Sequence, residues 1–150
     1  MILNSNKIRR LFMSVALPML TDTTYQCPSR EWVAELFRQF DHDMEWKPRK
    51  AGLLQRIFGD ALWCWTERND CDNFALHFMS TAQKLHKFTE QHTAQNVAVG
   101  EVWYMKDMTD YHAINVVVIG EESVLFIEPQ GPHFVELTEA ERDSISEVRI

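Results

Sequence analysis

The chain has 150 residues, 45% of them hydrophobic and 25% charged, with a formal net charge of -7. This size and balance are typical of one globular domain with one core, and the sequence has neither an internal repeat nor a low-complexity linker. Residues 1–150 are therefore predicted to form a single domain. The acidic charge and the scattered basic residues exclude the basic surface that nucleic acid requires, so no nucleic-acid partner is expected.

The three cysteines, Cys27, Cys64 and Cys71, form no CxxC spacing. Their odd number excludes a complete disulfide framework, and their spacing excludes a zinc ribbon. The apolar run over residues 8–20 is too short to span a bilayer, contains Pro18 and lacks the cleavage pattern of a signal peptide. We expect this run to form a helix or strand docked on the core of a cytoplasmic protein without membrane contact.

The first half of the chain has a helical pattern. Residues 28–40 carry apolar side chains at intervals of three and four, with Ser29 as the predicted N-cap. Residues 41–50 are expected to end that helix in a solvated loop, whose adjacent acidic and histidine side chains cannot converge on a metal. A further helix is predicted over residues 51–63, and a longer one over residues 71–88.

The second half changes to a strand pattern. Residues 97–105, 112–120 and 123–129 are rich in β-branched and aromatic side chains, and the last two strands are expected to form a hairpin. Thr138 and Glu141 form a capping-box pattern for a short helix, which a final strand is expected to follow. Helices followed by an antiparallel sheet predict an α+β domain.

Cys71 lies at the predicted start of the long helix. Backbone amides are unpaired there and the helix dipole is positive, so a thiolate at that position is stabilised. The neighbours Asp70 and Asp72 oppose this effect, because nearby carboxylates disfavour a thiolate. A cationic partner is therefore required, and the candidate is His112, at the start of a strand.

The loop of the predicted hairpin decides which residue lies beside His112. With a three-residue loop at 120–122, His112 shares one face of the sheet with Glu128 and Gln130, and Glu128 is its diagonal neighbour. A carboxylate or amide there would hold the Nδ1 proton of the ring and leave the other nitrogen facing the thiol. With a two-residue loop, Glu128 would lie opposite Asn115 on the other face, so Asn115 and Gln130 are candidate third members or supporting residues.

A cysteine opens a long helix in NDCDNFA, a histidine opens a strand in YHAINVVV, and an acid ends the next strand in LFIEPQ. In these motifs the chain resembles the papain-like cysteine hydrolases, and among them the C-terminal protease domain of the fairy-ring mushroom agglutinin and its bacterial and phage relatives. The resemblance covers roughly residues 60–132. It implies a papain-like fold with Cys71 as nucleophile, His112 as base and then acid, and Glu128 as the orienting group.

The function that this resemblance implies is a cysteine hydrolase that cleaves amide or peptide bonds through an acyl-thioester, with a peptide or peptidoglycan-like substrate. The residues require no cofactor, and calcium is suggested by the resemblance alone, because the fungal relative needs it. The backbone amide of Cys71 would supply one oxyanion donor, and Gln55 and Gln26 are of the right type for the second. Four aromatic residues are candidates for a substrate groove: Trp63, Trp65, Trp103 and Tyr104.

Two alternatives fit the same residues. One is a different acyl-transfer enzyme, either a peptidoglycan amidopeptidase or a transglutaminase-like acyltransferase, because a triad does not select the substrate. The other is a catalytically inactive binding or structural module on the same scaffold, because a fold does not fix a function. Alkylation of Cys71 separates a reactive thiol from an inert buried one, which reacts slowly.

Overall fold

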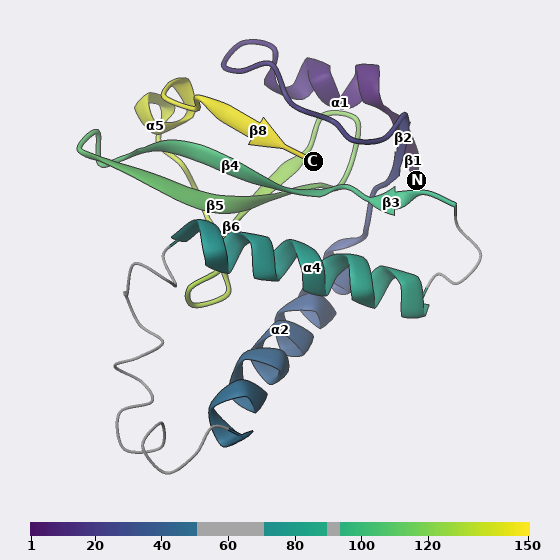
Figure 1. Ribbon diagram of the computed structural model, residues 1–150. Coiled ribbons are helices and arrows are strands. Elements are labelled where there is room, and N and C mark those ends of the chain that lie inside the picture. Colours follow the sequence, from purple (N-terminus) through teal and green to yellow (C-terminus); the bar gives the residue numbers. More distant parts are fainter. Residues whose placement is uncertain (51–70, 90–93) are drawn as a thin grey trace.

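The fold is organised around an antiparallel sheet of five strands in the order β7-β6-β5-β4-β8 (Figure 1). It is seen in a computed structural model that describes residues 1–50, 71–89 and 94–150, with side chains described up to residue 43 in the first range. The strands are β4 (Val99–Lys106), β5 (Asp110–Val118), β6 (Val124–Glu128), β7 (His133–Val135) and β8 (Glu147–Arg149). Together with the helices on its two faces, this sheet confirms the predicted α+β class.

One face of the sheet is covered by the N-terminal segment. Helix α1 (Ser5–Phe12) buries Ile8 and Phe12 in the same cluster as Ile114 and Val116 of β5, so the predicted docking of this segment is confirmed. A second, three-stranded sheet lies beside it and consists of β1 (Ile2–Asn4), β2 (Thr24–Gln26) and β3 (Asn96–Val97). Of the helices within the described ranges, none combines the length and the apolar composition needed to cross a membrane.

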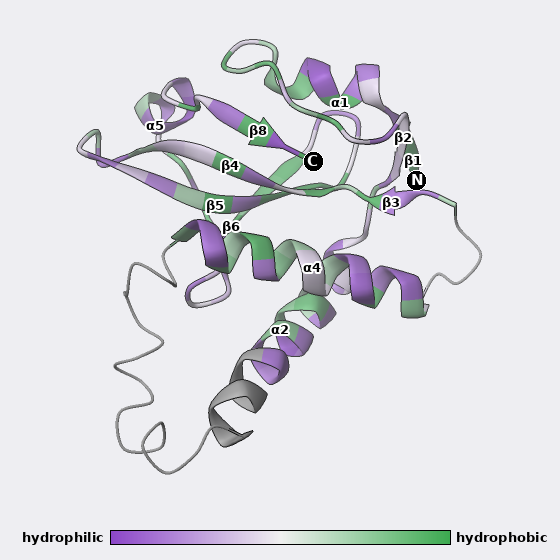
Figure 2. Ribbon diagram, viewed as in Figure 1, coloured by the Kyte–Doolittle hydropathy of each residue, from purple (hydrophilic) through white to green (hydrophobic). Residues whose placement is uncertain are grey.

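Helices α2 (Arg30–Lys50) and α4 (Cys71–Thr89) pack on the opposite face of the sheet. Figure 2 shows apolar and polar residues alternating along α4. Phe78 and Ala82 of α4 are buried in one cluster with Phe40 of α2 and Ile127 of β6. This cluster fixes α4, and therefore its first residue, against the strands.

The end of α2 differs from the prediction. The N-cap is confirmed, since the Trp32 amide donates to Ser29 Oγ at 3.2 Å. The predicted break at residues 41–50 is wrong, because the helix continues to Lys50. Asp43 accepts a hydrogen bond from Gln39, four residues earlier, at 3.1 Å and lies 3.5 Å from Lys84 Nζ on α4. These contacts stabilise the helix beyond its apolar stripe.

The hairpin of β5 and β6 has the three-residue loop of the first register considered above. The Ile119 amide donates to the Ser123 carbonyl at 3.0 Å, and Val118 pairs with Val124. The same register places Glu128 level with Ile114 of β5, as predicted. The C-terminal prediction is also confirmed, because Thr138 caps α5 (Glu139–Asp143) in a capping box and β8 follows.

Several predictions lie outside the described residues. They are the helix over residues 51–63, the candidate oxyanion residue Gln55, and the groove candidates Trp63 and Trp65. The described candidate for the oxyanion hole, Gln26, belongs to β2, in the small sheet.

Candidate functional site

Three side chains from different elements converge at the start of α4. Cys71 is the first residue of that helix, and its Sγ accepts a hydrogen bond from the Ala113 amide of β5 at 3.4 Å. Nε2 of His112 lies 2.7 Å from Oε2 of Glu128 at the end of β6, and the His112 side chain also hydrogen-bonds Cys71. The structure therefore brings together the thiol, imidazole and carboxylate that the sequence paired.

The end of β6 at Glu128, before Pro129, leaves room for the thiol beside β5. A proline has no N–H to donate to a sheet, and β6 ends at the residue before it. The described ladder between β5 and β6 stops at Asn115 and Ile127, so Ala113 has no ladder partner on β6. Its amide donates to the sulfur of Cys71 instead, which satisfies a backbone donor and fixes the thiol.

The site holds a buried ion pair beside the sulfur. Burial lowers the pKa of His112, but hydrogen bonds to Cys71 and Glu128 outweigh it and raise that pKa to about 9. Burial raises the pKa of Glu128, but the hydrogen bonds from His112 and from the Gln130 amide, 3.1 Å from Oε1, lower it by more. At neutral pH the ring is therefore protonated and the carboxyl ionised.

The two ring nitrogens exchange the roles predicted for them. Glu128 binds Nε2 of His112, whereas the sequence predicted Nδ1. Because the sulfur of Cys71 lies against the backbone of Ala113, the nitrogen nearer the backbone, Nδ1, is the one left for the thiol. The carboxylate consequently holds the ring by the nitrogen opposite to the expected one.

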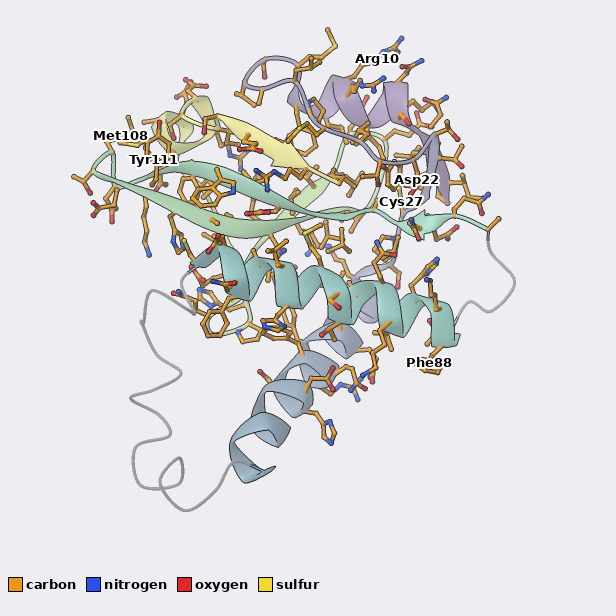
Figure 3. The ribbon with its side chains drawn as sticks, in the orientation of Figure 1. Arg10, Asp22, Cys27, Phe88, Met108 and Tyr111 are labelled. Carbon is orange, nitrogen blue, oxygen red and sulfur yellow. The ribbon has the colours of Figure 1, made fainter. Side chains whose placement is uncertain are left out.

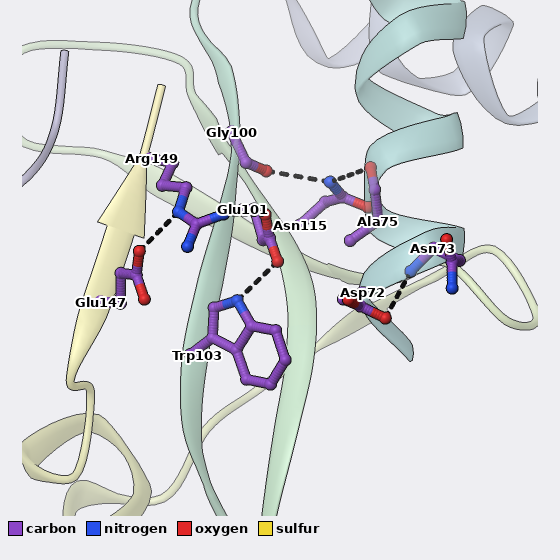
Figure 4. Close-up of polar contacts among 9 residues, drawn as sticks. All are labelled: Asp72, Asn73, Ala75, Gly100, Glu101, Trp103, Asn115, Glu147 and Arg149. Atoms are coloured by element: carbon purple, nitrogen blue, oxygen red, sulfur yellow. Dashed lines mark hydrogen bonds and ion pairs between the residues drawn. The ribbon is translucent and has the colours of Figure 1, made fainter. Parts of the chain in front are cut away.

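Asn115 and Gln130 support the site without being its third member. The Asn115 amide is fully buried and donates to the Ala75 carbonyl of α4 at 3.0 Å and to the Gly100 carbonyl of β4 at 2.9 Å (Figure 4). It therefore ties the first turns of the helix to the sheet. Gln130 contributes its backbone amide to Glu128.

The two described groove candidates have different surroundings. Tyr104 is 2% exposed and pairs with His112 across β4 and β5, with the two rings edge to face at a centroid distance of 5.9 Å. It is a core residue behind the imidazole, which corrects its predicted place in an open groove. Trp103 is half-buried, and its Nε1 donates to Glu101 Oε1 at 2.5 Å.

Sequence reasoning missed the buried Glu101. It is 1% exposed, its Oε2 has no hydrogen-bond partner in the described part of the chain, and Nη1 of Arg149 is 3.9 Å away. Burial raises its pKa, although the hydrogen bond from Trp103 and the charge of Arg149 lower it. An acid inside the apolar strand VAVGEVWYM was the available signal.

The described residues contain no group of three or more His, Cys, Asp or Glu side chains arranged to hold a metal ion. Calcium binding therefore stays a prediction that rests on the sequence resemblance.

Two solved structures are similar in fold. One is named "PSL1a-E64 complex" and is 16% identical with a TM-score of 0.67 over 99% of this chain. The other is Polyporus squamosus lectin bound to the human-type influenza-binding epitope Neu5Aca2-6Galb1-4GlcNAc, 14% identical with a TM-score of 0.68 over 99% of this chain. This chain spans about half of each, 51% and 49%. No protein-family model and no curated protein matches the sequence.

These structures correct the predicted family and function. Both are complexes of a lectin, and neither is named a hydrolase. The assignments of a papain-like cysteine hydrolase, of a peptidase or amidase activity and of a catalytic triad are therefore wrong for this chain. The alternative of a binding module agrees better with the comparisons, and they do not support a peptide or peptidoglycan-like substrate.

Proposed function

We propose that this chain is a ligand-binding module whose site is built on Cys71, His112 and Glu128. The observation that carries the proposal is the convergence of a thiol, a protonated ring and a carboxylate from three elements. Cys71 is partly exposed, whereas the side chains of His112 and Glu128 are 7% and 14% exposed. A ligand would therefore meet the sulfur first, with the ion pair behind it.

The sulfur of Cys71 has electropositive neighbours on several sides. A protonated imidazole donates to the sulfur, the Ala113 amide donates as well, and the positive end of α4 lies at the same place. A thiolate binds electrophilic ligands covalently. With an epoxide, the sulfur attacks a ring carbon, the carbon–oxygen bond breaks, and the alkoxide takes a proton from the His112 ring. The similar PSL1a structure, a complex with the epoxide E64, supports this choice of ligand chemistry.

The same proposal includes the finer description of the fold. A thiol at the first turn of a long helix that packs on an antiparallel sheet supports a papain-like arrangement of the elements, without the activity of that family. We also propose that residues 1–150 unfold as one domain.

A second candidate ligand is a glycan. The observation that favours it is the sialylated trisaccharide bound by the second similar structure. Because this chain spans about half of that lectin, the sugar is a proposal for this chain and needs its own measurement.

The experiment that tests the first ligand is incubation of the protein with E64, followed by intact mass and peptide mapping. We expect one adduct, located on Cys71, absent in Cys71→Ser and slowed at least about tenfold in His112→Ala. An adduct on Cys27 instead, or no adduct, would contradict the proposal.

For the second ligand, the trisaccharide Neu5Aca2-6Galb1-4GlcNAc is titrated and followed by saturation-transfer NMR, with lactose as the control sugar. Transfer to the trisaccharide that Cys71 alkylation blocks would support a glycan at this site. No transfer at millimolar sugar would exclude it.

A further inference from the structure

Trp103 and Glu147 stand on one face of the sheet, and Asp72 follows Cys71 at the start of the helix that packs on that face. We propose that these three residues form a subsite that selects ligands with a positively charged group next to the part that reaches Cys71. The inference deepens the proposed function and rests on it.

The position of Trp103 follows from the register of three strands. It pairs with Ala113 of β5 on one side and with Glu147 of β8 on the other. Side chains of directly opposed residues stand on the same face of a sheet. Ala113 is also the residue whose amide holds the sulfur of Cys71, and its side chain is a single methyl group. The indole is therefore one strand away from the thiol, with only that methyl group opposite it on β5.

A hydrogen bond to Glu101 holds the indole of Trp103 in place. Its Nε1 donates to Glu101 Oε1 at 2.5 Å, and Glu101 is buried on the same face two residues earlier. Since Trp103 is half-buried, part of its ring remains open to a ligand. The face of an indole attracts cations within about 6 Å, more strongly than the ring of tyrosine or phenylalanine.

The charges around the ring are mainly negative. Asp72 follows Cys71 at the start of α4, and the charges of both Asp72 and Glu147 act on Glu101. In Figure 4 the indole lies between β8, which carries Glu147, and the start of α4, which carries Asp72. Among the described residues, the guanidinium of Arg149 is a counter-charge to these carboxyls, and it already binds Glu147.

Glu101 gives a second, independent indication. Its Oε2 is buried without a hydrogen bond from any described residue, and Arg149 Nη1, 3.9 Å away, is within ion-pair distance but beyond hydrogen-bond distance. The negative potential beneath the indole is therefore incompletely compensated by the described residues. A ligand cation over the ring would complete that compensation, whereas an anion would be repelled by the carboxylates of Asp72 and Glu147.

The test uses thiol reagents that share one reactive group and differ in the charge of the group attached to it. Methanethiosulfonates with a trimethylammonium, a sulfonate or a neutral methyl group all react alike: the thiolate attacks the sulfenyl sulfur, a disulfide forms and methanesulfinate leaves. The quantity measured is the rate with the cationic reagent divided by the rate with the anionic reagent. At low salt we expect this ratio to be at least about tenfold higher for Cys71 than for the free thiol 2-mercaptoethanol. A change in the amount of thiolate alters the rates with all three reagents by the same factor, so it leaves the ratio unchanged.

Three variants are expected to lower this ratio about two- to fivefold each: Asp72→Asn, Glu147→Gln and Trp103→Leu. Glu122→Gln, the same charge change in the β5–β6 loop, is the matched control and is expected to leave the ratio unchanged. A fast neutral reaction with a ratio equal to that of 2-mercaptoethanol would overturn the subsite and leave the proposed function intact. No reaction of Cys71 with any of the three reagents would overturn both.

Discussion

The surroundings of Cys27 and Cys71 show how differently one residue type behaves within a single chain. Cys27 is 4% exposed in the cluster that includes Phe12, and burial raises its pKa to about 11, against a smaller lowering by the N-terminal charge. Figure 3 labels it beside β2 and β3, at the end of the five-stranded sheet away from Met108 and Tyr111. Cys71 is partly exposed and hydrogen-bonds both Ala113 and His112. The neighbours of a thiol, rather than the residue type, therefore decide whether it is reactive.

The largest expected effect is the contrast between these two thiols. A pKa of about 11, raised from 9.0, leaves Cys27 roughly a hundredfold less thiolate than an ordinary cysteine near neutral pH, and burial blocks access as well. Iodoacetamide at pH 7 should therefore label Cys71 at least about 100-fold faster than Cys27, as measured by peptide mapping over time. Equal rates in the folded protein would refute the contrast.

The next effect is on stability. Since the pKa of His112 is raised from 6.5 to about 9, its contribution is fully present below pH 6.5 and is lost as the pH rises to about 9. The loss amounts to about 3 kcal/mol at most. Urea unfolding at several pH values should show this decline in the parent chain and a flatter curve in His112→Gln. Parallel curves for the two proteins would count against the ion pair.

A smaller effect is expected from Glu128→Gln. A neutral amide removes the charge that helps to keep His112 protonated, so the labelling of Cys71 should slow about tenfold while Cys27 is unaffected. The matched control is Glu136→Gln, an exposed acid. A change at Glu136 as large as that at Glu128 would indicate a general charge effect.

The smallest expected change in rate follows Asn115→Leu. Losing the two hydrogen bonds that tie α4 to β4 should cost about 1–3 kcal/mol in unfolding free energy and slow Cys71 labelling about threefold. The labelling rate is measured below the unfolding midpoint, where the protein is folded, and is then compared with the loss of unfolding free energy. If stability falls and the rate does not, the amide holds the fold but does not position the thiol.

Much of the frame around Cys71 could be predicted from sequence because local rules determine it. The apolar spacing predicted α4, and the hairpin at Gly120 allowed two registers, one of which places His112 near Glu128 as observed. The capping residues Ser29 and Thr138 were found from their patterns alone.

The remaining features depend on contacts between residues far apart in the chain. Helix α2 continues past Asp41 with support from Lys84, and the ring of Tyr104 is buried because it packs on His112. The reversal of the ring nitrogens depends on where the Cys71 sulfur meets β5. None of these is visible in spacing or composition. The family was mispredicted for a related reason, since the same side chains can serve in several functions.

The three-residue turn between β5 and β6 carries a consequence for how this sequence can vary. Hairpin loops usually tolerate insertions and deletions well, because they lie on the surface and bury little. Here a loop change that shifts the strand register by one residue would turn Glu128 to the opposite face of the sheet and leave His112 without its carboxylate. The exposed turn at the far end of β5 is thus restricted to loops that keep this register.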